Sequence, residues 1–133
     1  MIVCFMESEN YGTWSLFTFW RKGFNHCFIV DYDPIANVWM KAECASERMN
    51  FQVFSGDEVD ALVGTLCTYA TCVDAQGDKN ATYFPRWLYC VSFVKHFLGI
   101  KKWWILTPYQ LYCELRKQGH PLIFEETEEI VNG

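Results

Sequence analysis

Two side chains that lie far apart in the chain have the chemistry of a nucleophile and its base. Cys90 lies near the start of residues 85–98, a segment with helical character, and His26 opens the apolar run His-Cys-Phe-Ile-Val sixty-four residues earlier. A thiol becomes a thiolate near neutral pH when a helix amino terminus or an imidazole lies beside it. The pair therefore suggests a cysteine nucleophile that a histidine activates.

A purely structural role for Cys90 is the alternative. On a helix over residues 85–98, Cys90 shares a face with Phe93, Val94, Phe97 and Leu98, which is an apolar stripe at helical spacing. Cysteine without a disulfide is often a small buried hydrophobe. Periodicity alone favours this interpretation, whereas the position of Cys90 near a helix start favours reactivity.

Three histidines are candidates for the base. His96 follows Cys90 by six residues, which places it about 240° around the same helix, and His120 lies in a Gly-His-Pro turn after the last helix. His26 enters a strand with Phe28 and Val30 on the same side, so its imidazole is expected on a sheet face that packs on a helix. His26 is the predicted base, with a half-buried structural histidine as the alternative.

A base also needs a group that orients it, and the next strand offers Lys41 and Glu43. Only a carboxylate can accept the second proton of an imidazole. Glu43 is therefore the predicted orienting residue. The alternatives are Lys41, no third residue, or an ordinary exposed role for Glu43.

Apolar patterning and turn signals predict the elements that position these residues. A hairpin of residues 26–32 and 37–44 turns at Asp33-Pro34-Ile35-Ala36, and Thr107-Pro108 begins a helix that ends at Gly119. The remaining elements are strands over residues 2–6, 50–54, 68–73 and 121–125 and helices over residues 11–24, 58–66 and 85–98, the last ending at Gly99. The prediction is an α+β fold: an antiparallel sheet of about four to six strands with helices packed on it.

Composition limits the classes of protein to consider. The chain has 133 residues, of which 51% are apolar and 18% aromatic, so a single domain over residues 1–133 is expected. The net charge of −5 is concentrated in an acidic tail at 125–133, and basic residues occur in scattered pairs, which disfavours nucleic-acid binding.

Membrane and metal signals are also missing from the sequence. No apolar stretch reaches about 18 residues and no signal peptide is indicated, so neither a membrane span nor secretion is expected, and the expected location is the cytoplasm. The chain has seven cysteines, which is an odd number, and no two of them form a Cys-x-x-Cys pair. Neither a metal site, a cofactor nor a disulfide framework is predicted.

Several short motifs together resemble a known family. They are Phe24-Asn25-His26-Cys27 opening a strand, residues 39–43 on the next strand, Tyr89-Cys90-Val91-Ser92-Phe93-Val94-Lys95 with Leu98-Gly99-Ile100, and Thr107-Pro108 before a last helix. This arrangement, over roughly residues 14–118, resembles the circularly permuted NlpC/P60-like, papain-like cysteine hydrolases. In that family the histidine strand precedes the cysteine helix and a polar third residue lies on the strand after the histidine, which matches the order His26, Glu43, Cys90.

The resemblance implies acyl transfer on a peptide, amide or ester substrate. Cys90 would attack the carbonyl, His26 would move the proton, Glu43 would orient His26, and the Cys90 backbone amide would contribute to an oxyanion site. The family more often has histidine, asparagine or glutamine as the third residue. An active site requires the Cys90 sulfur about 3 to 4 Å from a ring nitrogen of His26, in an accessible cleft.

The resemblance also carries a second hypothesis, because small phage-encoded relatives exist and some papain-like modules act only as scaffolds. The chain would then be a catalytically inactive structural or interaction module, such as a phage virion component, that contacts a protein partner in a larger assembly. Its location would be the host cytoplasm or the virion. Tryptophans such as Trp103 and Trp104 would serve that contact or would simply cover the core.

Overall fold

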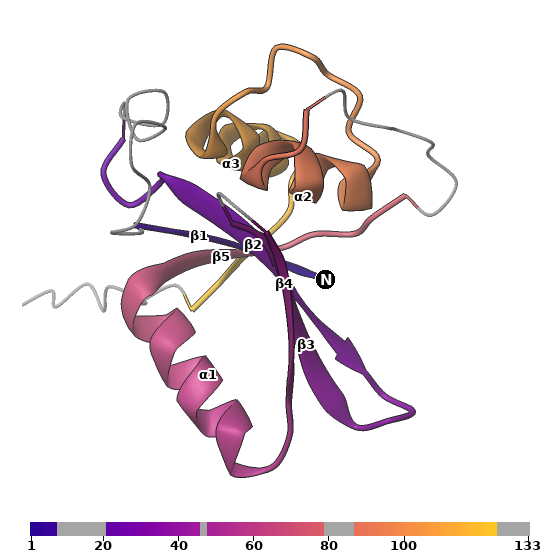
Figure 1. The fold of residues 1–133 in the computed structure, drawn as a ribbon. Coiled ribbons are helices and arrows are strands. Elements are labelled where there is room, and N and C mark those ends of the chain that lie inside the picture. The colour runs from indigo at the N-terminus through magenta and orange to yellow at the C-terminus, as the bar shows by residue number, and fades with distance from the viewer. Residues whose placement is uncertain (8–20, 46–47, 79–86, 125–133) are drawn as a thin grey trace, which may run out of the picture.

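The computed structural model describes residues 1–7, 21–45, 48–78 and 87–124. Within these ranges the chain has an α+β fold with a six-stranded antiparallel sheet and three helices, which confirms the predicted fold class (Figure 1). In chain order the elements are β1 (Ile2–Met6), β2 (His26–Asp33), β3 (Val38–Cys44), β4 (Met49–Phe54), α1 (Asp57–Tyr69), β5 (Ala70–Asp74), α2 (Cys90–Leu98), α3 (Pro108–Lys117) and β6 (Leu122–Ile123).

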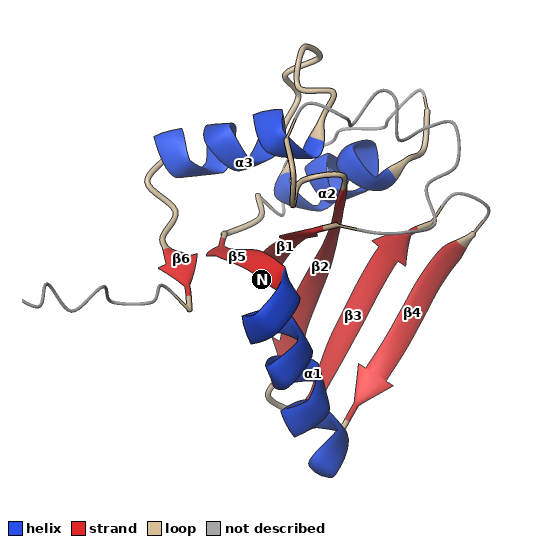
Figure 2. Cartoon of the chain, turned by 90° about the vertical axis from the view of Figure 1, so that its left-hand side faces the viewer, coloured by secondary structure: helices blue, strands red, loops and turns tan. Residues whose placement is uncertain are grey.

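The strands lie in the order β4-β3-β2-β1-β5-β6, with β4 at one edge of the sheet (Figure 2). The predicted hairpin and the strand that follows it form the continuous meander β2-β3-β4. The amino-terminal strand β1 lies between β2 and β5: Cys4 is opposite Phe28 on one side and opposite Cys72 on the other. The centre of the sheet therefore joins segments from the start and the middle of the chain.

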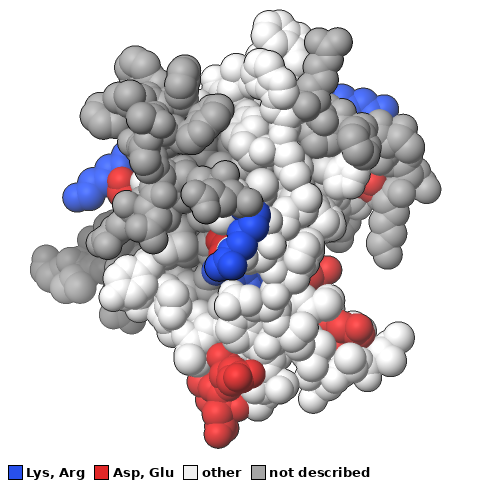
Figure 3. Space-filling view, viewed as in Figure 1, with Lys and Arg blue, Asp and Glu red and all other residues white. Residues whose placement is uncertain are grey.

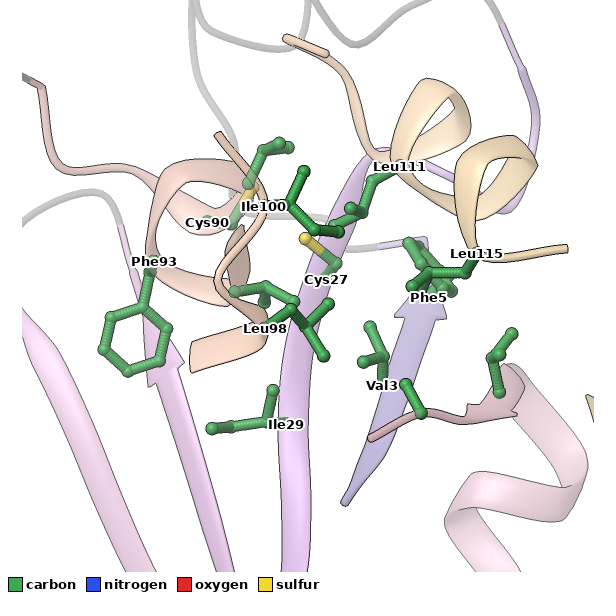
Figure 4. Close-up of a cluster of buried hydrophobic side chains, with 14 of the residues drawn as sticks. Val3, Phe5, Cys27, Ile29, Cys90, Phe93, Leu98, Ile100, Leu111 and Leu115 are labelled. Carbon is green, nitrogen blue, oxygen red and sulfur yellow. The ribbon is translucent and has the colours of Figure 1, made fainter. Parts of the chain in front are cut away.

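Alternation along the strands gives the sheet two buried faces. Figure 1 shows α2 and α3 on one side of the sheet and α1 on the other. The α2/α3 face contains Cys27 and Ile29 of β2, which pack with Cys90 and Leu98 of α2 (Figure 4). The α1 face contains Cys4, Phe28, Val30 and Cys72, which pack against Leu62 and Leu66. Neighbouring residues of β2 thus face different helices.

The turn between β2 and β3 has the chemistry that the sequence predicted. The Asp33 carboxylate accepts hydrogen bonds from the backbone N–H groups of Ile35, at 2.8 Å, and Ala36, at 3.2 Å. Asn37 then has a φ of 53°, a left-handed conformation that asparagine tolerates better than most residues. This turn fixes the register in which Val30 pairs with Lys41 and Ile29 pairs with Ala42.

Two predicted boundaries between helix and strand are wrong by a few residues. The helix expected to end at residue 66 continues to Tyr69, so β5 begins at Ala70 rather than at residue 68. The hydroxyl of Thr65 donates to the Ala61 carbonyl at 3.0 Å, and that of Thr68 donates to the Gly64 carbonyl at 2.8 Å. These bonds accommodate β-branched residues in a helix although their composition suggests a strand.

The start of α2 also differs from the prediction. The helix begins at Cys90, and residues 87–89 are not helical; Pro85, the predicted start, lies outside the described residues. Its end is as predicted, because Gly99 has a φ of 68°.

The last helix and strand, by contrast, lie close to their predicted positions. α3 begins after Thr107, whose hydroxyl accepts from the Gln110 backbone N–H, and it ends at Lys117, two residues before Gly119. β6 covers Leu122–Ile123 of the predicted strand. The helix predicted over residues 11–24 falls largely outside the described residues, and residues 21–24 form a turn.

Charged side chains do not gather into a basic surface on the face shown in Figure 3, where lysine and arginine are scattered among uncharged residues. Acidic side chains gather at the start of α1, whose first turn contains Asp57, Glu58 and Asp60. Carboxylates in this position interact favourably with the helix dipole. Among the described residues, no helix has the length and apolar character needed to cross a membrane.

Candidate active site

Cys90 is the first residue of α2, so it lies closer to the positive end of the helix dipole than the sequence suggested. Two contacts define this helix start. The Tyr89 backbone N–H donates to the Ser92 hydroxyl at 2.9 Å, and that hydroxyl donates to the Tyr89 carbonyl at 3.1 Å. Ser92 thus satisfies polar groups that a helix start leaves without partners. Cys90 is presented at a helix amino terminus, where a thiolate is favoured.

His26 and Glu43 form a hydrogen bond between neighbouring strands. The His26 Nε2 atom is 3.0 Å from the Glu43 Oε2 atom. His26 is the first residue of β2 and is 3% exposed, and its ring lies 5.9 Å from the ring of Phe28, measured between centroids. The structure therefore brings together the predicted base and the residue predicted to orient it.

The Cys90 thiol interacts with both His26 and Cys27. A hydrogen bond from the Cys27 side chain is the largest effect that lowers the pKa of Cys90; burial opposes it, and the interaction with His26 adds to it. The net pKa of Cys90 lies well below its ordinary value of 9.0. Burial raises the pKa of Cys27, and the hydrogen bond to Cys90 raises it further, so Cys27 is the protonated donor. Figure 4 shows both sulfur atoms between β2 and α2.

The two partners of His26 also change its protonation. Burial by itself lowers the pKa of His26, but its interactions with Cys90 and Glu43 outweigh burial, and the net pKa lies above the ordinary value of 6.5. The hydrogen bond from His26 lowers the pKa of Glu43 to about 2, with a smaller contribution from Lys41. These directions are those of a thiolate, an imidazolium and a carboxylate in series.

The sequence predicted that His26 would lie on a sheet face covered by a helix, and that face is the one that α1 covers. Phe28, which contacts His26, belongs to the α1 face, whereas Cys27 and Cys90 belong to the α2/α3 face. Although they belong to different faces of the sheet, the thiol and the imidazole interact, because His26 is the first residue of β2 and Cys90 is the first residue of α2. Because Glu43 engages Nε2, Nδ1 is the ring nitrogen that would face the thiol.

Cys90 is buried, whereas an active site requires the thiol to lie in an accessible cleft. Cys90 is 5% exposed. A surface hollow of about 370 Å³ begins beside Glu43 and is lined by Glu43, Arg48, Met49, Asn50, Phe51 and Gln52. A second, of about 670 Å³, is lined by Met1, Asp31, Ala75, Gln76, Gly77, Asp78, His96 and Phe97. Cys90 is in neither lining, and Glu43 is the residue that the first hollow shares with the candidate site.

The other two histidines lie elsewhere in the fold. His96 is exposed and lines the second hollow, as expected from its angle around α2. The His120 backbone carbonyl accepts from the Arg116 guanidinium at 2.9 Å. All seven cysteines have free thiols, and the described residues contain no cluster of three or more histidine, cysteine or acidic side chains suited to a metal ion.

Sequence reasoning missed three contacts of the site. Cys27 donates to the nucleophile, Lys41 is 3.5 Å from Glu43, and Asn50 forms a side-chain hydrogen bond with Glu43. The spacing of Lys41 and Glu43 places both on one face of β3, which was a usable signal. The contact with Asn50 depends on the pairing of Glu43 with Asn50 between β3 and β4, which the sequence does not give.

Comparisons of the chain with models of protein families, with curated proteins and with solved structures found no match.

Proposed function

We propose that the chain is a cysteine hydrolase of the circularly permuted NlpC/P60-like, papain-like type, acting on a peptide, amide or ester. The observation that carries this proposal is the continuous set of contacts from Cys90 through His26 to Glu43. His26 comes from β2, Glu43 from β3 and Cys90 from α2, which is the chain order that the resemblance implies. The lowered pKa of Cys90 and the raised pKa of His26 support the same roles.

Acylation would begin with the Cys90 thiolate. Its sulfur attacks the carbonyl carbon, a C–S bond forms, and an electron pair moves onto the carbonyl oxygen. The Cys90 backbone N–H, at the amino terminus of α2, would stabilise that oxyanion. The His26 imidazolium then protonates the leaving group as the bond to it breaks, which gives a thioester and a neutral imidazole.

Deacylation would return the enzyme to its starting state. Neutral His26 removes a proton from water, the resulting hydroxide attacks the thioester carbonyl, and the C–S bond breaks to release the acid and the thiolate. Throughout, Glu43 accepts the hydrogen bond from His26 Nε2 and keeps the other ring nitrogen toward the sulfur.

A catalytically inactive papain-like module that binds a protein partner is the second candidate. It is favoured by the burial of Cys90, at 5% exposed, and of His26, at 3%. It is also favoured by exposed aromatic side chains: Trp87 is 82% exposed and Trp103 is 76% exposed. Large exposed aromatic residues are typical of binding surfaces.

Alkylation of individual cysteines separates the two functions. The protein is treated with iodoacetamide at pH 6, and the rate at each cysteine is measured by peptide mass spectrometry. Cys67 and Cys113 are exposed and serve as internal controls. If the protein is a hydrolase, iodoacetamide should alkylate Cys90 at least about tenfold faster than Cys67 and Cys113, because the thiolate is the form of cysteine that reacts. His26→Ala should remove the difference.

Two results would count against a hydrolase: alkylation of Cys90 no faster than that of Cys67, or a fast reaction that His26→Ala leaves unchanged. Hydrolysis of an activated ester tests turnover directly. It should depend on Cys90 and be lost in Cys90→Ala. Rapid alkylation without ester or peptide hydrolysis would favour a binding module that retains a reactive thiol.

A further inference from the structure

Lys41, like protonated His26, contacts the carboxylate of the candidate site. Its Nζ atom is 3.5 Å from Glu43 Oε1, the carboxylate oxygen that does not contact His26. Its side chain is 20% exposed and that of Glu43 is 18% exposed, so both are partly removed from water. The two oxygens of Glu43 therefore have separate partners, a lysine and a histidine.

The packing of Lys41 holds it in this position. Its Nζ atom is also 4.5 Å from the centre of the Phe28 ring, a geometry that favours a cation. Lys41 pairs with Val30 and is two residues before Glu43, so both side chains lie on the α1 face of β3. Phe28, in turn, contacts the ring of His26. Lys41 thus contacts Glu43 and Phe28, and both of these residues contact His26.

This arrangement answers a chemical difficulty of the proposed reaction. A general acid is most effective when its pKa is close to the working pH, because it must give up its proton as the leaving group departs. A full negative charge hydrogen-bonded to the imidazolium would hold that proton too strongly. A cation on the other carboxylate oxygen reduces the negative potential at His26.

We propose that Lys41 is a positioning residue that acts through Glu43, so that the Lys41–Glu43 pair presents His26 with a nearly neutral hydrogen-bond acceptor. The role of the pair in proton transfer rests on the proposed hydrolase function. The ion pair and its influence on the imidazole do not depend on turnover, and so they can be tested separately.

Several other residues around His26 must be left unsubstituted in any test of this pair. The polar or titratable residues that face the site from the surrounding elements are Cys27 on β2, Cys44 on β3, Arg48 and Asn50 at β4 and Cys90 on α2. Substitutions are therefore confined to Lys41 and Glu43, so that a change at His26 can be attributed to this pair.

The experiment is an NMR titration of His26 in protein labelled with ¹⁵N histidine. The chain has three histidines, so His26 is assigned by comparison with His26→Asn. Lys41→Met removes the positive charge but keeps an aliphatic stem of similar length, and the pKa of His26 is expected to rise by about 0.5 to 1 unit. Lys41→Arg keeps the charge, and the pKa of His26 should stay within about 0.2 units of its original value.

Two further variants complete a double-mutant cycle. Glu43→Gln removes the negative charge and leaves that of Lys41, so the pKa of His26 should fall below the value in the unmodified protein. Lys41→Met combined with Glu43→Gln should give a value between those of the two single variants. Lys41→Gln replaces Lys41→Met if the latter does not fold, as judged by circular dichroism.

The proposal is overturned if Lys41→Met, or Lys41→Gln in its place, folds and the pKa of His26 is unchanged or lower. It is also overturned by an equal rise in Lys41→Arg, because that would show an effect of side-chain shape. The cysteine alkylation assay is run on the same samples. A loss of the proposed function would appear there as a Cys90 rate that does not depend on His26, whatever the titration shows.

Discussion

Replacing Glu43 by glutamine should destabilise the folded protein at neutral pH and have a smaller effect in acid. The ordinary pKa of this carboxyl group is 4.5, and the hydrogen bond from His26 lowers it to about 2. A lowered folded-state pKa contributes stability that is present above the unfolded value of about 4.5 and is lost as the pH falls toward the folded value. Glutamine keeps the shape of the side chain but has no such charge.

The magnitude follows from the pKa. A fall from 4.5 to about 2 corresponds to about 3.4 kcal/mol at 1.36 kcal/mol for each unit. The Glu43 side chain is 18% exposed and borders a surface hollow, so solvent screening reduces this value. We therefore expect Glu43→Gln to lower the free energy of unfolding by about 1 to 2 kcal/mol at pH 7. At pH 3 the difference should be half of this or less.

Urea unfolding at pH 7, 5, 4 and 3 measures the difference between the two proteins directly. Asp60→Asn is the control, because it neutralises an exposed carboxylate in the first turn of α1. The reasoning is refuted if the difference caused by Glu43→Gln is the same at pH 7 and pH 3. It is also refuted if Asp60→Asn reproduces its pH dependence.

Three further predictions concern residues around the site. Because the folded-state pKa of His26 is raised, its contribution to stability is present below about pH 6.5 and is lost as the pH rises through the folded value. His26→Asn should therefore lower the free energy of unfolding in urea, and the difference from the unmodified protein should shrink at alkaline pH. Cys27→Ala removes the thiol that donates to Cys90, so the pH of half-maximal Cys90 alkylation should rise. It also leaves a small cavity, so the free energy of unfolding should fall by about 1 to 2 kcal/mol. Lys95 is buried and its ammonium group donates to two loop carbonyls at 2.7 and 3.1 Å, so Lys95→Met should lower the melting temperature by removing both bonds, which a thermal unfolding scan measures.

The parts of the fold that the sequence predicts well are those that depend on local chemistry. The turn after β2 requires Asp33 to accept nearby backbone N–H groups, and α3 requires the hydroxyl of Thr107 and the fixed φ of Pro108. Each signal lies within a few residues of the structure that it specifies. The hairpin in turn predicts that His26 and Glu43 lie on neighbouring strands, which is the contact observed at 3.0 Å.

The parts that the sequence does not predict depend on pairing between distant segments. Nothing near Ile2–Met6 indicates that β1 lies between β2 and β5. The start of α2 was also misjudged, because proline is a strong signal for a first turn while the bonds of Ser92 to Tyr89 are visible only in three dimensions. Cys27 contacts Cys90 only because α2 covers that face of β2.

The charges of the candidate site explain how the ionised form of the Cys90 thiol would be compatible with burial. An isolated thiolate at a residue that is 5% exposed would be strongly disfavoured, and so would an isolated imidazolium at one that is 3% exposed. Along the set Lys41, Glu43, His26 and Cys90, however, each charge lies next to one of opposite sign, and the sum is zero. Burying such a set costs less than burying any one of its members, whereas removing one partner leaves a neighbouring charge uncompensated. The four residues should therefore act as a unit, and the effects of substituting them in pairs should differ from the sums of the single effects.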